Sequence, residues 1–163
     1  MEPYAICYLS LYFLVLGILC VYGMHRFLMT WLYRRHGGDA PPEPRRFEVL
    51  PFVTIQLPLY NEPRVVERLL RATCAIDYPR DRFEIQVLDD STDETSRIVG
   101  RLLPEFAAKG ITLRHIRRKT RTGFKAGALA QGLEMARGEF LLVFDADFVP
   151  PSDILHRMIH HFT

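Results

Sequence analysis

The feature that most constrains the fold is a strict alternation of strand-like and helix-like segments, which begins at Phe52. Apolar runs expected to form strands occupy residues 52–57, 83–88, 111–116 and 140–144. After each run, apolar residues recur at the three- and four-residue spacing of a helix. Strands that alternate with helices form right-handed βαβ units around a parallel sheet. The predicted fold class for this part of the chain is therefore α/β with a mainly parallel sheet.

Local signals refine the predicted helices. The motif Ser91-Thr-Asp-Glu94 has the form of a capping box and should open the second helix. Pro104 lies inside that helix and should kink or split it, because proline lacks an amide hydrogen. The third helix should bury one face, formed by Leu129, Leu133 and Ala136. The strand at 140–144 is apolar throughout and should be fully buried.

An uncharged segment of 21 residues, 4–24, precedes this domain and is long enough to span a bilayer as a helix. A cleaved signal peptide would have basic residues before the apolar run. Here Glu2 precedes the run, and basic residues follow it: Arg26, Arg34 and Arg35. By the positive-inside rule, these arginines would place the remainder of the chain in the cytoplasm. We therefore expect a membrane protein with a cytoplasmic domain.

The composition of the next segment separates the helix from the domain. Residues 37–44 are rich in glycine and proline, as in a linker. The expected organisation is a transmembrane helix with its juxtamembrane segment over 1–36, a linker over 37–50, and an α/β domain over 51–163.

Polar side chains follow every predicted strand. Pro58-Leu-Tyr60-Asn-Glu62 comes after the first strand, Asp89-Asp90 after the second, and Asp145-Ala-Asp147 after the fourth; a basic loop follows the third. Ligands of parallel sheets bind at the carboxyl ends of the strands. These residues are therefore candidates for a shared site, although solubilising loops would also be polar.

The pair Asp145 and Asp147 is the strongest single candidate. In an extended backbone, side chains two residues apart point to the same side, so both carboxylates could converge on one point. Paired carboxylates at a strand end suit Mg²⁺ or Mn²⁺ bridging to phosphates. The alternative is that the pair caps a helix near Ser152.

Basic residues dominate the loop after the third strand. Between Glu105 and Glu134 the chain has seven lysines and arginines and no acidic residue. Most of these are expected to be solvated or to face anionic lipid. Lys125 differs because it lies at a helix N-terminus, where the helix dipole favours an anion such as a diphosphate.

Three further residues have two interpretations each. Tyr60 could stack on a base or pack against a neighbouring loop. Asp90 could accept hydrogen bonds from a base or ribose, or cap a helix. Glu62 could contact a ligand or serve as a first-turn acid.

Together, the motifs Pro58-Leu-Tyr-Asn-Glu62, Leu88-Asp-Asp-Ser-Thr-Asp93, Gly123-Phe-Lys-Ala-Gly-Ala128 and Phe144-Asp-Ala-Asp-Phe-Val-Pro150 resemble those of family 2 glycosyltransferases. The similarity is strongest to the membrane-bound cellulose synthase and mannan synthase-like group, and it covers the chain from about Phe52 onward. The resemblance implies a Rossmann-like GT-A fold and transfer of a sugar from a nucleotide donor with inversion.

The resemblance also implies residue roles. Three residues would line the nucleotide pocket: Pro58, Tyr60 and Glu62. Asp89 and Asp90 would bind base and ribose, with Asp90 the preferred contact, and Lys125 would lie near the diphosphate. Asp145 and Asp147 would form the DxD motif that holds Mg²⁺ or Mn²⁺, with Asp147 the direct ligand.

The implied donor is UDP-glucose or GDP-mannose, and the implied acceptor is a growing polysaccharide or a lipid. Membrane lipids are expected partners, and nucleic acid is not. The family's Thr-Glu-Asp-like motif, which holds the catalytic base, and its Gln-x-x-Arg-Trp motif do not occur up to Thr163. We therefore expect a truncated domain, the donor-binding half of a longer protein, that does not turn over alone.

Two other hypotheses remain open. The strand followed by Asp145-x-Asp147 also fits haloacid dehalogenase-like phosphatases, in which Asp145 would be the nucleophile and Asp147 the acid/base. The chain could also be a non-catalytic nucleotide-binding module.

Overall fold

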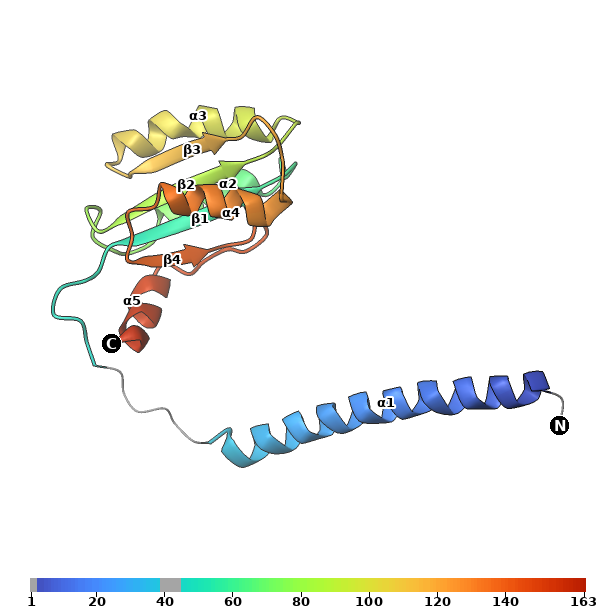
Figure 1. The fold of residues 1–163 in the computed structure, drawn as a ribbon. Coiled ribbons are helices and arrows are strands. Elements are labelled where there is room, and N and C mark those ends of the chain that lie inside the picture. The colour runs from blue at the N-terminus through green and yellow to red at the C-terminus, as the bar shows by residue number, and fades with distance from the viewer. Residues whose placement is uncertain (1–2, 39–44) are drawn as a thin grey trace. The chain divides into compact units, whose positions relative to one another are not determined.

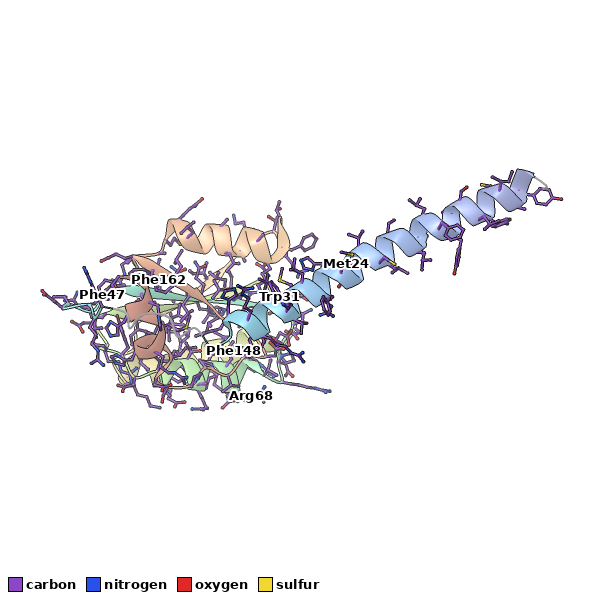
Figure 2. The ribbon with its side chains drawn as sticks, turned by 90° about the horizontal axis from the view of Figure 1, so that it is seen from below. Met24, Trp31, Phe47, Arg68, Phe148 and Phe162 are labelled. Carbon is purple, nitrogen blue, oxygen red and sulfur yellow. The ribbon has the colours of Figure 1, made fainter. Side chains whose placement is uncertain are left out.

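The chain forms two separate units, seen in a computed structural model that describes residues 3–38 and 45–163. The units are Met1–Glu43 and Pro44–Thr163. In its described part the first unit is one helix, α1 (Pro3–His36) (Figure 1). By length and composition α1 could cross a membrane, although a signal sequence near an N-terminus would pass the same test. Its apolar side chains, including Met24 and Trp31 (Figure 2), are exposed.

The second unit is built on a parallel four-stranded sheet, as predicted. Its strands are β1 (Val53–Leu59), β2 (Phe83–Asp89), β3 (Leu113–Arg117) and β4 (Phe140–Val143). They lie in the order β3-β2-β1-β4, so β1 is flanked by β2 and β4 (Figure 1). The order reverses at β1, and the carboxyl ends of β1 and β4 therefore open the crevice in which such sheets bind ligands.

Helices cover both faces of the sheet (Figure 1). Their bounds are α2 (Val66–Cys74), α3 (Thr95–Ala108), α4 (Phe124–Glu134) and α5 (Ile154–Met158), followed by the 3₁₀ helix η1 (Ile159–Phe162). α4 packs on β1 and β2, whereas α2 and α3 pack together with the apolar core on the opposite face.

The two faces of the sheet differ in chemistry. The face toward α2 and α3 carries apolar residues such as Ile55 and Ile85, which are fully buried. The face toward α4 carries buried polar pairs: Thr54 donates to Glu84 at 2.9 Å, and Gln56 donates to Gln86 at 3.0 Å. The apolar face therefore provides the hydrophobic core, and the other face is held by hydrogen bonds.

This polar face explains why the predicted burial of α4 is wrong. The buried residues of α4 are Ala128 and Gly132, while Leu133 is exposed. A Cβ at Gly132 would lie 2.5 Å from Gln56 Nε2 and 2.9 Å from Gln86 Oε1. Small residues therefore face the sheet because the glutamine pair lies directly beneath them.

The predicted capping box is wrong, and Pro104 does not split its helix. α3 begins at Thr95 and its N-cap makes no side-chain bond; the Ser91 hydroxyl accepts the Asn61 amide instead, so no capping box forms. Pro104 lies within α3, which continues unbroken to Ala108.

β4 is not fully buried, contrary to prediction, because it lies at an edge of the sheet. Phe140 and Leu142 pack against the core, whereas Leu141 and Val143 point to the α4 side and are exposed. In the described residues α4 contacts β1 and β2, so the β4 end of this face is open.

Part of the predicted linker belongs to the domain. The Phe47 amide donates to His160 Nδ1 at 3.2 Å. Phe47 and Phe162 (Figure 2) both pack against Phe140, with ring centroids 6.1 and 5.4 Å away. The segment from residue 45 onward is thus fixed to the start of β4 and to η1; residues 39–44 of the predicted linker lie outside the described residues.

Candidate functional site

A pocket of about 270 Å³ lies at the carboxyl ends of β1, β2 and β4. Its lining residues are Pro58, Leu59, Tyr60, Glu62, Leu88, Asp90, Arg121, Lys125, Ala128 and Asp145. The topology thus brings together six residues that the sequence singled out: Pro58, Tyr60, Glu62, Asp90, Lys125 and Asp145. Asp89 and Asp147 are not among the lining residues.

The loops after β1 and β2 are braced against each other by Asn61. Asn61 has a left-handed backbone, φ 56°. Its amide donates to Ser91 Oγ at 3.0 Å, and its side-chain oxygen accepts the Thr92 amide at 2.9 Å. Asparagine tolerates this conformation better than most residues. This brace positions the neighbouring Tyr60, and sequence reasoning did not identify it.

Tyr60 is half exposed at the pocket and packs against a cation. The guanidinium carbon of Arg121 lies 3.3 Å from the Tyr60 ring centroid and 5.0 Å from that of Phe124. Of the two interpretations of Tyr60, the structure shows packing against the neighbouring loop. An aromatic ring and a guanidinium plane can each stack on a base, so both groups are suited to a nucleotide.

Asp90 is held by a largely buried arginine. Arg118 Nε donates to Asp90 Oδ1 at 2.9 Å, and Arg118 Nη2 donates to Asp90 Oδ2. The two side chains are 11% and 6% exposed. This hydrogen bonding raises the pKa of Arg118. Asp90 is therefore a fixed carboxylate at the pocket wall and does not cap a helix.

Asp89 is buried, with partners inside the protein. Its carboxylate accepts the Ser91 amide at 2.9 Å and lies 2.8 Å from His115 Nε2. Burial raises the pKa of Asp89, but hydrogen bonds from His115, Ser96 and Ser91 outweigh it and hold the pKa well below its usual range. Asp89 thus orders the turn that carries Asp90.

Lys125 and Asp145 form an ion pair at the other end of the pocket. Their side chains are 52% and 63% exposed, so the pair is well solvated and contributes little to stability. The cation predicted to meet a diphosphate and a carboxylate predicted to meet a metal thus lie in contact. An incoming anion and cation could each replace one member of this pair.

Asp145 and Asp147 do not lie in an extended segment. Residues 146 and 147 form a turn, closed by the Phe148 amide donating to the Asp145 carbonyl at 3.0 Å. Neither aspartate caps α5, whose N-cap residue is Asp153. Both side chains are exposed.

The donor set fits a metal that is also held by substrate. Among residues 3–38 and 45–163, no three His, Cys, Asp or Glu side chains gather as a metal cluster. Mg²⁺ and similar ions are commonly bound by one or two carboxylates, with phosphate and water oxygens completing the shell. Asp145, which lines the pocket, and the exposed Asp147 can supply such carboxylates.

Comparison with known proteins identifies related sequences. Residues 54–163 match the family model for glycosyl transferase family 2. The chain is 43% identical over 113 residues to glucomannan 4-beta-mannosyltransferase 2 of Arabidopsis thaliana, covering 67% of this chain and 21% of that protein. It is 42% identical over 118 residues to glucomannan 4-beta-mannosyltransferase 1 of Cyamopsis tetragonoloba, covering 70% of this chain and 22% of that protein. The chain therefore spans about a fifth of the length of these relatives.

Solved structures show the same fold. The mannosyltransferase PcManGT from Pyrobaculum calidifontis, in complex with GDP-Man and Mn²⁺, superposes with a TM-score of 0.76 at 29% identity, covering 91% of this chain and 43% of that one. S. aureus TarS 1–349, in complex with UDP-GlcNAc, gives a TM-score of 0.54 at 28% identity, covering 66% and 30%. These similarities support the transferase hypothesis and give no support to the phosphatase alternative.

Proposed function

The chain belongs to glycosyl transferase family 2, and from that premise we propose that it forms the donor-binding part of a metal-assisted, inverting hexosyltransferase. The observation that carries this proposal is the convergence of Tyr60, Asp90, Lys125 and Asp145 on one pocket. They supply an aromatic face, a hydrogen-bond acceptor, a cation and a metal-binding carboxylate. A nucleoside diphosphate sugar requires all four kinds of contact.

The proposed orientation of the donor follows from the lining residues. The base would lie at Tyr60 and Arg121, with Asp90 accepting hydrogen bonds from base or ribose. The diphosphate would lie at Lys125, beside the first turn of α4, whose amides and dipole favour an anion. Lys125 would exchange Asp145 for phosphate oxygens when the donor binds.

Asp145 and Asp147 would hold the metal, Mg²⁺ or Mn²⁺, with Asp147 the direct ligand. When bound, such an ion acts as a Lewis acid that stabilises charge on the departing diphosphate. Lys125 would add a second positive charge at the same oxygens.

We propose GDP-mannose as the donor in preference to UDP-glucose. The relatives named above are mannosyltransferases, and PcManGT was solved with GDP-Man. TarS, a more distant structure, was solved with UDP-GlcNAc. The acceptor would be a growing polysaccharide or a lipid.

Asp90 and Asp145 are both engaged with cations, so neither is proposed as the general base for the acceptor hydroxyl, and the chain alone would bind donor without transferring sugar.

α1 would span the membrane, with Arg26, Arg34 and Arg35 keeping the domain on the cytoplasmic side.

Isothermal titration calorimetry of the 163-residue chain in detergent micelles tests the donor site. GDP-mannose should bind more tightly than UDP-glucose, and Mn²⁺ should strengthen binding. Asp147→Ala should remove the Mn²⁺ effect, whereas Asp153→Ala, which changes an exposed aspartate at the N-cap of α5, should not. If neither donor binds, with or without metal, the proposed function is refuted.

A further inference from the structure

Arg118 makes four side-chain hydrogen bonds at the edge of the pocket, and no sequence pattern predicted them. It directly follows β3 and, besides its two bonds to Asp90, it donates to two backbone carbonyls. Nη1 reaches the Thr122 carbonyl at 2.8 Å, and Nη2 reaches the Phe124 carbonyl at 2.9 Å. Four of the five N–H donors of a guanidinium are thus directed at defined partners.

The first turn of α4 leaves room for this side chain. A Cβ at Gly127 would lie 2.1 Å from the Thr122 carbonyl oxygen and 2.7 Å from Arg118 Nη1, which donates to that oxygen. Such separations are too short for real contacts, so glycine at this position allows the carbonyl and the guanidinium to lie against the helix. Arg118 is therefore enclosed by β2, the loop from 118 to 124 and α4.

The groups that Arg118 holds belong to both ends of the pocket. Asp90 lines the proposed base end. The loop closed by the Thr122 and Phe124 carbonyls carries Arg121, which lies over Tyr60, and leads directly into Lys125. Arg118 itself is not a lining residue, so its influence on a ligand must act through these neighbours.

We propose that Arg118 is a positioning residue for nucleotide recognition: it fixes the Asp90 carboxylate and the 118–124 loop in the geometry that the donor requires. This inference rests on the proposed function. Each carboxylate oxygen has two acceptor sites, so Asp90 held by Arg118 still has capacity to accept from a ligand N–H or O–H.

Lysine cannot replace arginine in this role. An ammonium is a point charge, whereas the planar guanidinium binds a carboxylate with two parallel hydrogen bonds and still reaches two carbonyls. Arg118→Lys preserves the charge and loses the geometry. It therefore separates positioning from simple electrostatic attraction.

Calorimetry of the full chain with GDP and Mn²⁺ tests the inference. Arg118→Ala and Arg118→Lys should each weaken binding about tenfold or more, as expected for lost charge-assisted hydrogen bonds. Lys119→Ala removes one charge from an exposed neighbour and should change affinity less than about twofold, by the weak effect of surface charges. Millimolar methylguanidinium should restore part of the affinity of Arg118→Ala and none of that of Arg118→Lys.

Amide hydrogen exchange in the nucleotide-free chain provides a second measurement. The amides of Phe124 and Gly127, which close the turn into α4, should exchange faster in both Arg118 variants than in Lys119→Ala. This readout and the thermal midpoint distinguish local loosening from failure to fold.

The binding results distinguish failure of the positioning inference from failure of the proposed function. If the wild type binds GDP and Arg118→Lys binds equally well, the positioning inference is wrong and the proposed function stands. If the wild type binds neither GDP nor UDP, the proposed function is wrong and the inference falls with it, whatever the exchange rates show.

Discussion

The close approach of α4 to the glutamine pair makes a quantitative prediction for Gly132→Ala. The added Cβ would lie 2.5 Å from Gln56 Nε2, 2.9 Å from Gln86 Oε1 and 2.9 Å from Leu88 Cδ2. The two glutamines are buried and bonded to each other, so neither can move away without losing that bond. Overpacking of this kind typically costs about 1–3 kcal/mol.

Gly100→Ala in α3 is the matched control. Gly100 is an exposed helical glycine, and its added Cβ would meet nothing within 4 Å. This substitution should stabilise the domain by about 0.5–1 kcal/mol, because alanine is the better helix former. The same helix preference applies at Gly132, so the difference between the two variants isolates the packing cost at about 1–3 kcal/mol.

Urea unfolding followed by circular dichroism measures both free energies of unfolding in one set of conditions. Gly132→Ala should unfold at lower urea than the wild type, and Gly100→Ala at higher urea. Equal stability of the two variants would show that the layer beneath α4 can relax, and would refute the packing argument.

Three further predictions concern single side chains. Because the pKa of Asp89 is depressed, its carboxylate stabilises the fold above about pH 4, and this contribution is lost as the pH falls further, through the folded pKa. Asp89→Asn should therefore flatten the loss of unfolding free energy between about pH 5 and pH 2.5, whereas Asp81→Asn at the surface should not. Tyr60→Ala should weaken GDP binding about tenfold or more, within the usual contribution of base stacking. Tyr60→Phe keeps the ring and should retain the wild-type affinity. Equal affinities of the two variants would argue against stacking. Burial raises the pKa of Cys74 to about 12, so in a Cys7→Ser/Cys20→Ser background iodoacetamide at pH 8 should label the chain only after denaturation, and rapid labelling of the native protein would contradict its burial.

The strands and the main lining residues were predictable from the sequence. Strands in a parallel sheet end at one edge, so polar residues after each apolar run mark that edge without further information. Tyr60, Asp90 and Asp145 were found in this way. Lys125 was found because it begins a helix within a glycine-bearing segment.

The roles of Arg118 and Arg121 were not predictable, because a basic run does not show which of its members turn inward. That choice depends on the register of β3 against β2, which places Arg118 on the α4 side of the sheet, beside Asp90. The register arises from the tertiary pairing of strands.

The prediction of which face of α4 is buried failed for a related reason. Leucine spacing assumes that a helix packs on an apolar surface, but Gly132 of α4 lies against the buried pair Gln56 and Gln86. Likewise, Ser91 has the sequence context of a helix cap, but its hydroxyl accepts a hydrogen bond from the distant Asn61 amide instead. Local patterns are reliable only where no distant partner competes for the same group.

The two faces of the sheet should differ in how much apolar surface is exposed when the helices that cover them separate. The hydrogen-bonded pair Gln56 and Gln86 lies beneath α4, whereas the hydrophobic core lies on the opposite face. Separating α4 from the sheet would uncover the glutamine pair Gln56 and Gln86 together with Leu88, whereas separating α2 or α3 would uncover the hydrophobic core. Opening events that expose little apolar surface depend weakly on denaturant. The helix that carries Lys125 is therefore expected to open at a lower free energy than the helices that cover the hydrophobic core.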